Sequence, residues 1–285
     1  MTGARQDNTQ VILYNPRRMI WYFPTLAFAL GAIVGSFLNV VIHRYPREES
    51  VVFPPSRCPH CGNRIRPWDN IPILAYLWLL GRCRDCRATI SPRYPLVELA
   101  NALFYAAIFQ RTGVTPGFLA LAALVSMTIV LIYIDLEIQI LPDVVDLPGV
   151  AIGLLIGATH MGARYPDLLL SKTLLESIAG AALGAGVLLA IAMAYKLLRK
   201  VEGMGLGDVK MMAMLGAVVG WEPLFPLLVL ASLAGAVVGI PIALRSEAGM
   251  QVAVPFGVFL GLAFLAVLFF GPTLWSLWLK LLLGG

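Results

Sequence analysis

Charged residues are scarce in this chain. Aspartate, glutamate, lysine and arginine make up 13% of the 285 residues, whereas hydrophobic residues make up 59%. Soluble globular domains have about 25% charged residues. Mean hydropathy is +0.82. This small number of charged residues cannot cover the surface that a soluble chain of this length would expose to water. A soluble enzyme, a disordered chain and a disulfide-rich secreted scaffold are therefore excluded. The composition predicts a polytopic membrane protein.

Several patterns of well-known enzyme sites are also missing. The chain has three histidines, widely separated, and it contains neither an H-E-x-x-H metal motif nor a G-x-S-x-G nucleophile motif. It also lacks a glycine-rich dinucleotide-binding fingerprint. A histidine metal site and a serine nucleophile are therefore not expected. The chemistry has to be sought among the acids and the cysteines.

Long apolar segments dominate what is present. A membrane-spanning helix needs about 17–25 mostly apolar residues. Residues 71–80 are apolar but too few, which is typical of an interfacial or re-entrant piece. The sequence predicts an all-α polytopic membrane protein with about eight transmembrane helices, at residues 21–42, 95–109, 116–134, 138–159, 173–198, 209–220, 223–244 and 252–283.

The basic residues predict how these helices are oriented. Nine arginines lie between residues 44 and 93, and four lysines and arginines lie between residues 196 and 210. With eight spans both segments are on the same side, which the positive-inside rule makes cytoplasmic. The net charge of +5 is interpreted as a topology signal, so membrane lipid is an expected partner and nucleic acid is not.

Glycines four residues apart recur in the apolar segments. This spacing lets helices approach closely in lipid, so the pairs are interpreted as packing sites without chemistry. They are Gly31 and Gly35, Gly180 and Gly184, Gly216 and Gly220, Gly235 and Gly239, and Gly257 and Gly261.

All four cysteines fall in the arginine-rich loop, as two C-x-x-C pairs with 21 residues between them: Cys58, Cys61, Cys83 and Cys86. Two such hairpins can place four thiolates around a structural zinc ion. Two disulfides and a redox role are alternatives, but a cytoplasmic loop is kept reduced. His60 is a further possible ligand, although four cysteines already fill the zinc coordination shell.

Acids at the ends of apolar segments are the candidate catalytic groups, because an acid inside a membrane is costly and is by default functional. Asp135 ends the third predicted span, and Asp208 opens the sixth on the same side. Two facing carboxylates can share a proton and supply a base for water and an acid for the leaving amine. Alternatively, Asp208 caps a helix, and Asp143 and Asp146 favour a helix N-terminus.

Five segments together resemble a known family. They are residues 35–44 (GSFLNVVIHR), the paired C-x-x-C loop, residues 91–98 (SPRYPLVE), residues 135–143 (DLEIQILPD) and residues 205–208 (GLGD). The chain resembles the bacterial prepilin peptidases, or type IV leader peptidases, in the form that also has N-methyltransferase activity. Residues 160–171 form a longer segment than this family leads us to expect, and residues 1–18 lie outside the resemblance.

The resemblance implies a membrane aspartic peptidase whose catalytic pair is Asp135 and Asp208, with Asp135 preferred over Asp143. It implies prepilins and type II secretion pseudopilins as substrates, cleaved after a glycine between a basic leader and an apolar helix. It also implies S-adenosylmethionine as the donor that methylates the new amino terminus. The enzyme would lie in the bacterial cytoplasmic (inner) membrane with its active site facing the cytoplasm.

Two other functions stay open on the sequence alone. One is a peptidase without methyltransferase activity, and the other is a non-enzymatic zinc-bearing scaffold or transporter that uses the acids as a proton or ion relay. The expected organisation is an N-terminal tail (1–20), a first transmembrane helix (21–43), a cytoplasmic four-cysteine zinc loop (44–94) and a multi-helix membrane peptidase domain (95–285).

Overall fold

The computed structural model describes residues 16–200, 204–245 and 254–283, and within these ranges it is helical with no strand. Helices η1 (Tyr45–Arg47) and η2 (Pro67–Asn70) are short 3-10 turns in the four-cysteine loop. The α-helices are α1 (Pro16–Arg44), α2 (Leu74–Trp78), α3 (Arg93–Thr112), α4 (Pro116–Ile138), α5 (Asp143–Ala158), α6 (Met161–Arg164), α7 (Leu174–Arg199), α8 (Leu206–Val219), α9 (Leu224–Arg245) and α10 (Phe256–Leu283).

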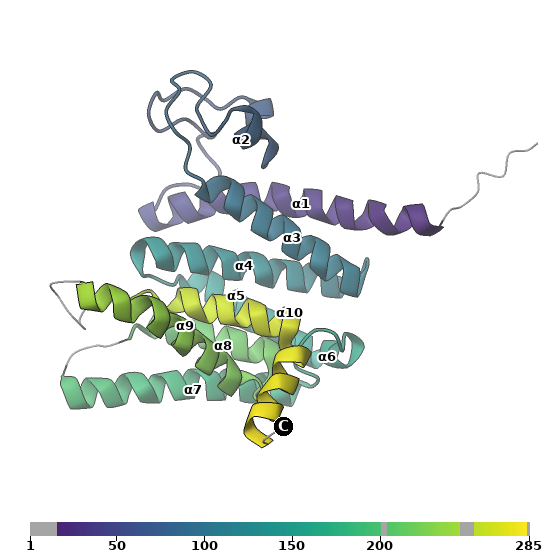
Figure 1. The fold of residues 1–285 in the computed structure, drawn as a ribbon, viewed down its shortest axis with the longest axis vertical. Helices are drawn as coiled ribbons and strands as arrows, with labels where there is room; N and C mark the ends of the chain where they lie inside the picture. Colours follow the sequence, from purple (N-terminus) through teal and green to yellow (C-terminus); the bar gives the residue numbers. More distant parts are fainter. Residues whose placement is uncertain (1–15, 201–203, 246–253, 284–285) are drawn as a thin grey trace, which may run out of the picture.

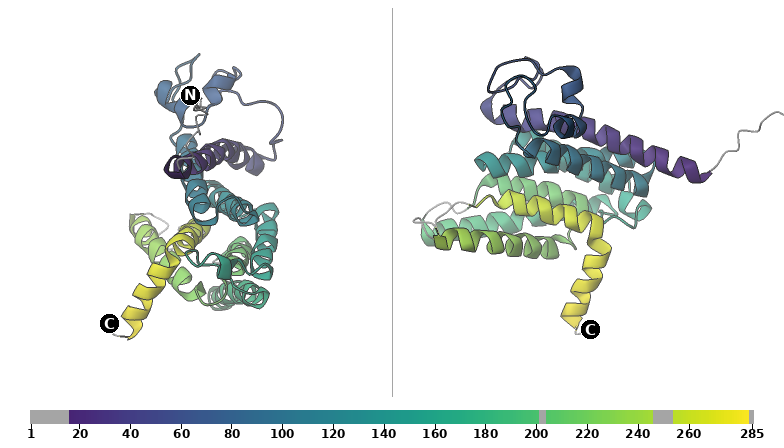
Figure 2. Two further views of the ribbon diagram at one scale, coloured as in Figure 1. Left: turned by 90° about the vertical axis from the view of Figure 1, so that its right-hand side faces the viewer. Right: turned by 45° about the horizontal axis from the view of Figure 1, so that its top comes forward.

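The long helices lie side by side in layers, and the four-cysteine loop stands apart from them (Figure 1). Helices α1 and α3 form the layer next to the loop, α4 follows, and α5, α7, α8, α9 and α10 make up the rest of the bundle. Figure 2 shows the loop beyond the α1–α3 pair and the second half of α10 bending away from the bundle. That half contains Pro272, a residue that kinks helices.

The expected count of eight spans is not confirmed. Within the described ranges, five helices are long and apolar enough to cross a membrane: Tyr22–Arg47, Pro116–Ile138, Leu174–Arg199, Leu224–Arg245 and Phe256–Leu274. The segments expected at 95–109, 138–159 and 209–220 are the helices α3, α5 and α8. The first candidate span starts at Tyr22, next to the predicted start at residue 21, whereas the helix α1 that contains it starts at Pro16, inside the expected tail. Residues 1–15 of that tail, and the start of the last predicted span at 252–253, lie outside the described residues.

Helices α5 and α8 are too short to span a bilayer by themselves. With 16 and 14 residues, they extend about 24 and 21 Å at 1.5 Å per residue, against a hydrocarbon thickness of about 30 Å. Helix α5 is shortened because Gln139 ends α4 in a left-handed conformation and Pro142 precedes the first turn of α5. Most residues of α8 between Val209 and Val219 are buried. The helix is apolar because other helices surround it. The segment at residues 71–80 contains only the five-residue α2.

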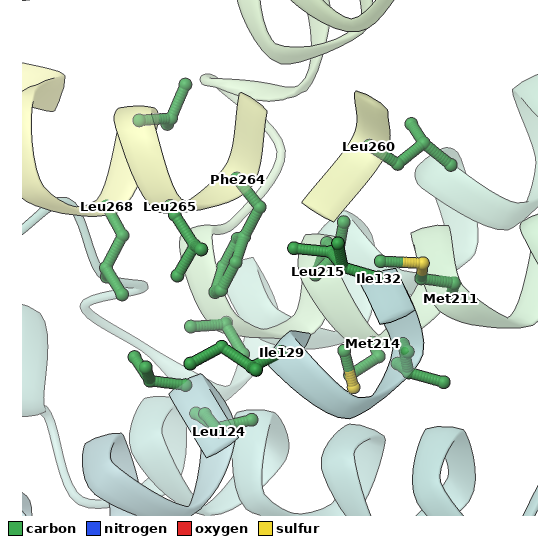
Figure 3. Packing of buried hydrophobic residues seen from close by; sticks show 14 of the residues in the cluster. Leu124, Ile129, Ile132, Met211, Met214, Leu215, Leu260, Phe264, Leu265 and Leu268 are labelled. Carbon is green, nitrogen blue, oxygen red and sulfur yellow. The ribbon is translucent and has the colours of Figure 1, made fainter. Parts of the chain in front are cut away.

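The hydrophobic core lies where α4, α8 and α10 meet (Figure 3). Leu124 and Ile129 of α4, Leu215 of α8 and Phe264 of α10 belong to this core, and Phe264 is fully buried. This packing fixes the ends of α4, α8 and α10 relative to one another. The two candidate catalytic acids lie at those ends, so the core determines their spacing.

Most of the glycine pairs pack helices together as predicted. Gly31 and Gly35 lie against the backbone of α3 at Ala102 and Glu98, and a methyl group on Gly180 would stand 2.1 Å from the Gly216 carbonyl oxygen. Gly220 differs, because its φ of +81° ends α8 in a conformation that glycine adopts readily.

Replacing Gly180 with alanine is expected to destabilise the bundle by about 1–3 kcal/mol, because backbone atoms of α8 cannot yield to the added methyl group as a side chain would. The Gly186→Ala variant is the matched control in the same helix, since nothing lies within 4 Å of a methyl group there. Thermal unfolding of both variants in the same membrane mimetic measures the difference. Equal midpoints would contradict the close approach of α7 and α8.

Candidate active site and metal centre

Asp135 sits in the last turn of α4 with its side chain buried, at 4% exposure. The backbone N–H of Val258, in the first turn of α10, donates to its Oδ2 atom at 3.0 Å. Unpaired N–H groups at a helix start favour a carboxylate. Gly257 makes this approach possible, because a methyl group there would stand 2.9 Å from the same Oδ2 atom. The spacing of Gly257 and Gly261 predicts helix packing, and no local pattern in the sequence indicates the contact of Gly257 with this acid.

Asp208 lies in the first turn of α8, directly after Gly205 and Gly207, and is half-buried. The helix begins at Leu206, and no side chain caps it. The helix-capping alternative for Asp208 is therefore not what the structure shows. The carboxylate is close enough to Asp135 for their charges to interact.

Leu141 connects the surroundings of the two acids. It belongs to the short non-helical link between α4 and α5 and is buried. A methyl group on Gly207 would stand 2.9 Å from its Cβ atom, and one on Gly257 would stand 3.0 Å from its Cδ1 atom. One leucine side chain thus lies against the start of α8 and the start of α10. Gly207 directly precedes Asp208, and Gly257 lies against the Asp135 carboxylate. Because neither glycine has a side chain, both leave room for Leu141.

Asp143, the alternative first acid, has a different environment. It opens α5, its side chain is 56% exposed, and Lys210 Nζ donates to both of its carboxylate oxygens at 2.6 and 2.7 Å. Both oxygens of the Asp143 carboxylate are thus engaged by a lysine of α8.

Asp146 is the acid whose burial the sequence did not predict. It was assigned to the positive end of a helix, and it does lie in the first turn of α5, but it is completely buried. Neither of its carboxylate oxygens has a hydrogen-bond partner among the described residues. Asp143, Lys210 and Asp208 are close enough to act on its charge. One turn of helix thus points a third acid into the bundle beside the catalytic candidates.

The four cysteines form one cluster, with their Sγ atoms all within 4.8 Å of one another. Each pair sits in the same local structure: the Cys58 and Cys83 N–H groups donate to the carbonyls of Asn63 and Ala88 at 3.0 and 2.8 Å. The Cys58 and Cys86 Sγ atoms are 3.8 Å apart. Four sulfurs at about 2.3 Å from a tetrahedral zinc ion are separated by about 3.8 Å. This donor set fits zinc, and His60 does not join it.

Ion pairs around the cluster hold the rest of the loop. Arg84 donates to both carboxylate oxygens of Asp69, from Nε at 2.7 Å and from Nη2 at 2.5 Å. The guanidinium of Arg84 holds the pKa of the Asp69 carboxyl below its usual value. Burial opposes ionisation of Cys58, but hydrogen bonds from the backbone of Cys61 and His60 outweigh it, so the pKa of this thiol falls to about 7. The loop is thus tied together by polar contacts, as expected where a segment lacks an apolar core.

Arg93 links the helix that follows the four-cysteine loop to the helix that carries Asp135. It begins α3, and its guanidinium forms a close ion pair with Glu137, two residues beyond Asp135 in α4. Both side chains are partly buried, at 17% and 29% exposure. The cysteine loop and the acids therefore lie at the same end of the helices, linked through one ion pair.

The segment with the two acids and the segment with the four cysteines both match known protein families. Residues 122–240, with both acids, match the model of the type IV leader peptidase family, and residues 29–112, with the four cysteines, match the bacterial peptidase A24 N-terminal domain. A prepilin leader peptidase/N-methyltransferase of Pseudomonas putida is 37% identical over 92% of this chain and 95% of its own length. The chain belongs to the type IV leader peptidase family.

Further relatives in this family carry the same name. The proteins of Aeromonas hydrophila and Burkholderia pseudomallei, each called a prepilin leader peptidase/N-methyltransferase, are 38% and 37% identical over 89% and 91% of this chain. They are covered over 93% and 88% of their own lengths. No solved structure matches the chain significantly.

Replacing Gly257 with alanine is expected to lower peptide cleavage about tenfold or more, without loss of the fold. The new methyl group displaces the Asp135 carboxylate, and misplacing a reacting group by about 1 Å costs about a hundredfold in rate. Cleavage of a prepilin by the purified variant is the measurement, with Gly186→Ala as the control glycine substitution. Wild-type rates for Gly257→Ala would show that the position of this carboxylate is not critical.

Proposed function

We propose that this protein removes the leader peptide from type IV prepilins and type II secretion pseudopilins and then methylates the amino terminus that cleavage exposes. The similarity to prepilin leader peptidase/N-methyltransferases over nearly the whole chain carries this proposal. The placement of two acids at the end of the bundle that also holds the cysteine loop supports it.

In the proposed reaction Asp135 and Asp208 form the catalytic pair. One carboxylate takes a proton from the attacking water, and the other protonates the amine that leaves, so each carboxylate moves one proton. The first turn of α10 fixes Asp135 through the Val258 N–H. The half-buried position of Asp208 gives it access to a peptide. The pairing of Asp143 with Lys210 favours Asp135 over Asp143 as the first acid.

Two bound groups belong to the proposal. Cys58, Cys61, Cys83 and Cys86 hold a zinc ion, which supplies folding energy to a loop without a core of its own and has no open position for catalysis. S-adenosylmethionine supplies the methyl group: a sulfonium methyl is transferred to a free amine, which loses one proton, and a neutral thioether remains.

The location follows from the positive-inside rule and the family. The protein lies in the bacterial cytoplasmic membrane with the acids and the cysteine loop facing the cytoplasm. A prepilin would have its basic leader in the cytoplasm and its apolar helix in the membrane, so the bond between them meets the acids at the interface. We divide the chain as the composition suggests, into a tail (1–20), a first helix (21–43), a zinc loop (44–94) and a membrane peptidase domain (95–285).

Incubation of the purified protein with a prepilin, with and without S-adenosylmethionine, tests the proposal directly. Mass spectrometry of the pilin is expected to show loss of the leader in both cases and addition of one methyl group only with the donor. Cleavage without methylation would indicate a peptidase alone. No cleavage at all would favour a scaffold or transporter that uses its acids as an ion relay.

A further inference from the structure

A cavity of about 480 Å³ lies between the four-cysteine loop and the helices α1 and α3. This volume is in the range of small-molecule sites. The loop forms its roof, including Cys58, Cys83 and Tyr76, and the two helices form its floor. The peptidase mechanism uses none of these side chains, and the acids Asp135 and Asp208 do not line this space.

The floor presents a buried oxygen that has no partner. Asn39 of α1 is 2% exposed, and its Nδ2 group donates to the carbonyls of Tyr94 at 3.0 Å and Gly35 at 3.3 Å. Those two bonds fix the amide and leave its Oδ1 atom without a hydrogen-bond partner among the described residues. A buried acceptor that is left unpaired costs about 1–3 kcal/mol. A ligand that donates a hydrogen bond to Oδ1 would remove this cost.

A buried carboxylate lies on the same floor. Glu98 of α3 is 8% exposed and accepts the backbone N–H of Ile73 at 2.7 Å. Ile73 itself adopts φ +62° and ψ −54°, a backbone conformation that is unfavourable for a β-branched residue. No lysine or arginine forms an ion pair with Glu98 within the described part of the chain. The loop thus has a strained backbone at Ile73, where it donates a hydrogen bond to Glu98, an acid that lacks a cationic partner among the described residues.

The cavity offers opposite charges and aromatic surface within one space. Glu98 supplies a negative group, and Arg93 lines the cavity with a buried Nε atom that has no partner among the described residues, although its Nη1 pairs with Glu137. The rings of Tyr76 and Tyr94 also line it. A ligand that fits this lining has a cationic group, an anionic group and a flat ring with hydrogen-bond donors.

We propose that this cavity binds S-adenosylmethionine, with Asn39, Glu98 and Arg93 as its polar floor. The inference rests on the proposed methyltransferase function and adds a place for the donor. The amino acid end of the donor has an ammonium and a carboxylate, its sulfonium is a second cation, and its adenine has an exocyclic amine that donates. Glu98 attracts the cations, Arg93 Nε donates to the carboxylate, and the Asn39 oxygen accepts from a donor N–H.

This placement also brings the sites of the two reactions to the same end of the helices. Arg93 lines the cavity and is ion-paired with Glu137, two residues from Asp135. The amine that cleavage frees at the acids would therefore arise at the same end of the helices as the cavity, with the Arg93–Glu137 ion pair between the two sites. The product of hydrolysis reaches the donor without crossing the membrane.

Binding of labelled S-adenosylmethionine to the purified full-length protein, by equilibrium dialysis, tests this site without relying on methylation. Glu98→Gln is expected to weaken binding about tenfold to a hundredfold, because the amide oxygen still accepts the Ile73 N–H but the negative charge is lost. Glu176→Gln is the matched control, since Glu176 accepts the Lys172 N–H at the same 2.7 Å and does not line the cavity. Zinc content and thermal unfolding report whether each variant is folded.

A second measurement does not depend on any variant. Ultraviolet cross-linking of the labelled donor to the wild-type protein is expected to mark peptides within 36–98. Marked peptides elsewhere, or equal donor binding by Glu98→Gln and the wild type, would overturn this site while the methyltransferase function stands. A wild-type protein that neither binds nor uses the donor would instead overturn the proposed methyltransferase function.

Discussion

Leader cleavage by the Asp208→Asn variant, and separately by Asp135→Asn, is expected to fall about 10²–10⁴-fold, which an ordinary assay records as complete loss. An asparagine keeps the shape of the side chain but cannot take up and release the proton that amide hydrolysis requires. Asp135→Asn also keeps an oxygen for the Val258 N–H, so the start of α10 can stay in place. The loss is therefore chemical rather than structural.

Two controls make this result specific. Asp143→Asn is the same substitution at an exposed, lysine-paired acid a few residues away, and it is expected to be mild. Asp208→Asn should still methylate a pilin supplied already cleaved, because methyl transfer to a free amine does not need the water-activating pair. If Asp143→Asn were inactive while Asp135→Asn still cleaved, the first acid would be Asp143. Near-normal cleavage by Asp208→Asn would rule out the two-aspartate mechanism.

Replacing Cys58 and Cys61 together with serine is expected to remove zinc completely and unfold the loop. Half of the ligands are lost, and a structural zinc ion contributes about 10–16 kcal/mol of apparent binding free energy in zinc-finger peptides. Elemental analysis should give one zinc per wild-type chain and none in the variant. Because the loop roofs the cavity between itself and the α1–α3 pair, methylation of a cleaved pilin should be lost with the metal.

His60→Ala is the matched control for the cysteine variant. His60 lies between Cys58 and Cys61 in the same turn, is exposed and does not belong to the sulfur cluster. We expect this variant to retain zinc, because the imidazole is not one of the four ligands. A wild-type protein without metal and with a disulfide in each C-x-x-C pair would contradict both the zinc site and the cytoplasmic position of the loop. Full methylation by the cysteine variant would remove the loop from the donor site.

The sequence alone determined the features that depend on residue type and local spacing. The scarcity of charge predicted a helical membrane protein, and five helices meet the requirements of length and composition for crossing a membrane. The two C-x-x-C pairs predicted a four-sulfur cluster, and the Sγ atoms converge. These inferences succeed because hydrophobicity follows the environment of each segment and because short motifs impose their own turn geometry.

The tertiary structure decided what depends on contacts between distant segments. Hydropathy does not distinguish burial in lipid from burial in protein, because both surroundings are apolar. For this reason α8, which the other helices enclose, was predicted as a span although it has only 14 residues. Gly257 lies more than a hundred residues from Asp135, and only the packing of α10 on α4 brings its backbone to that carboxylate. The buried Asp146 and the unpaired oxygen of Asn39 likewise depend on neighbours that no local pattern encodes.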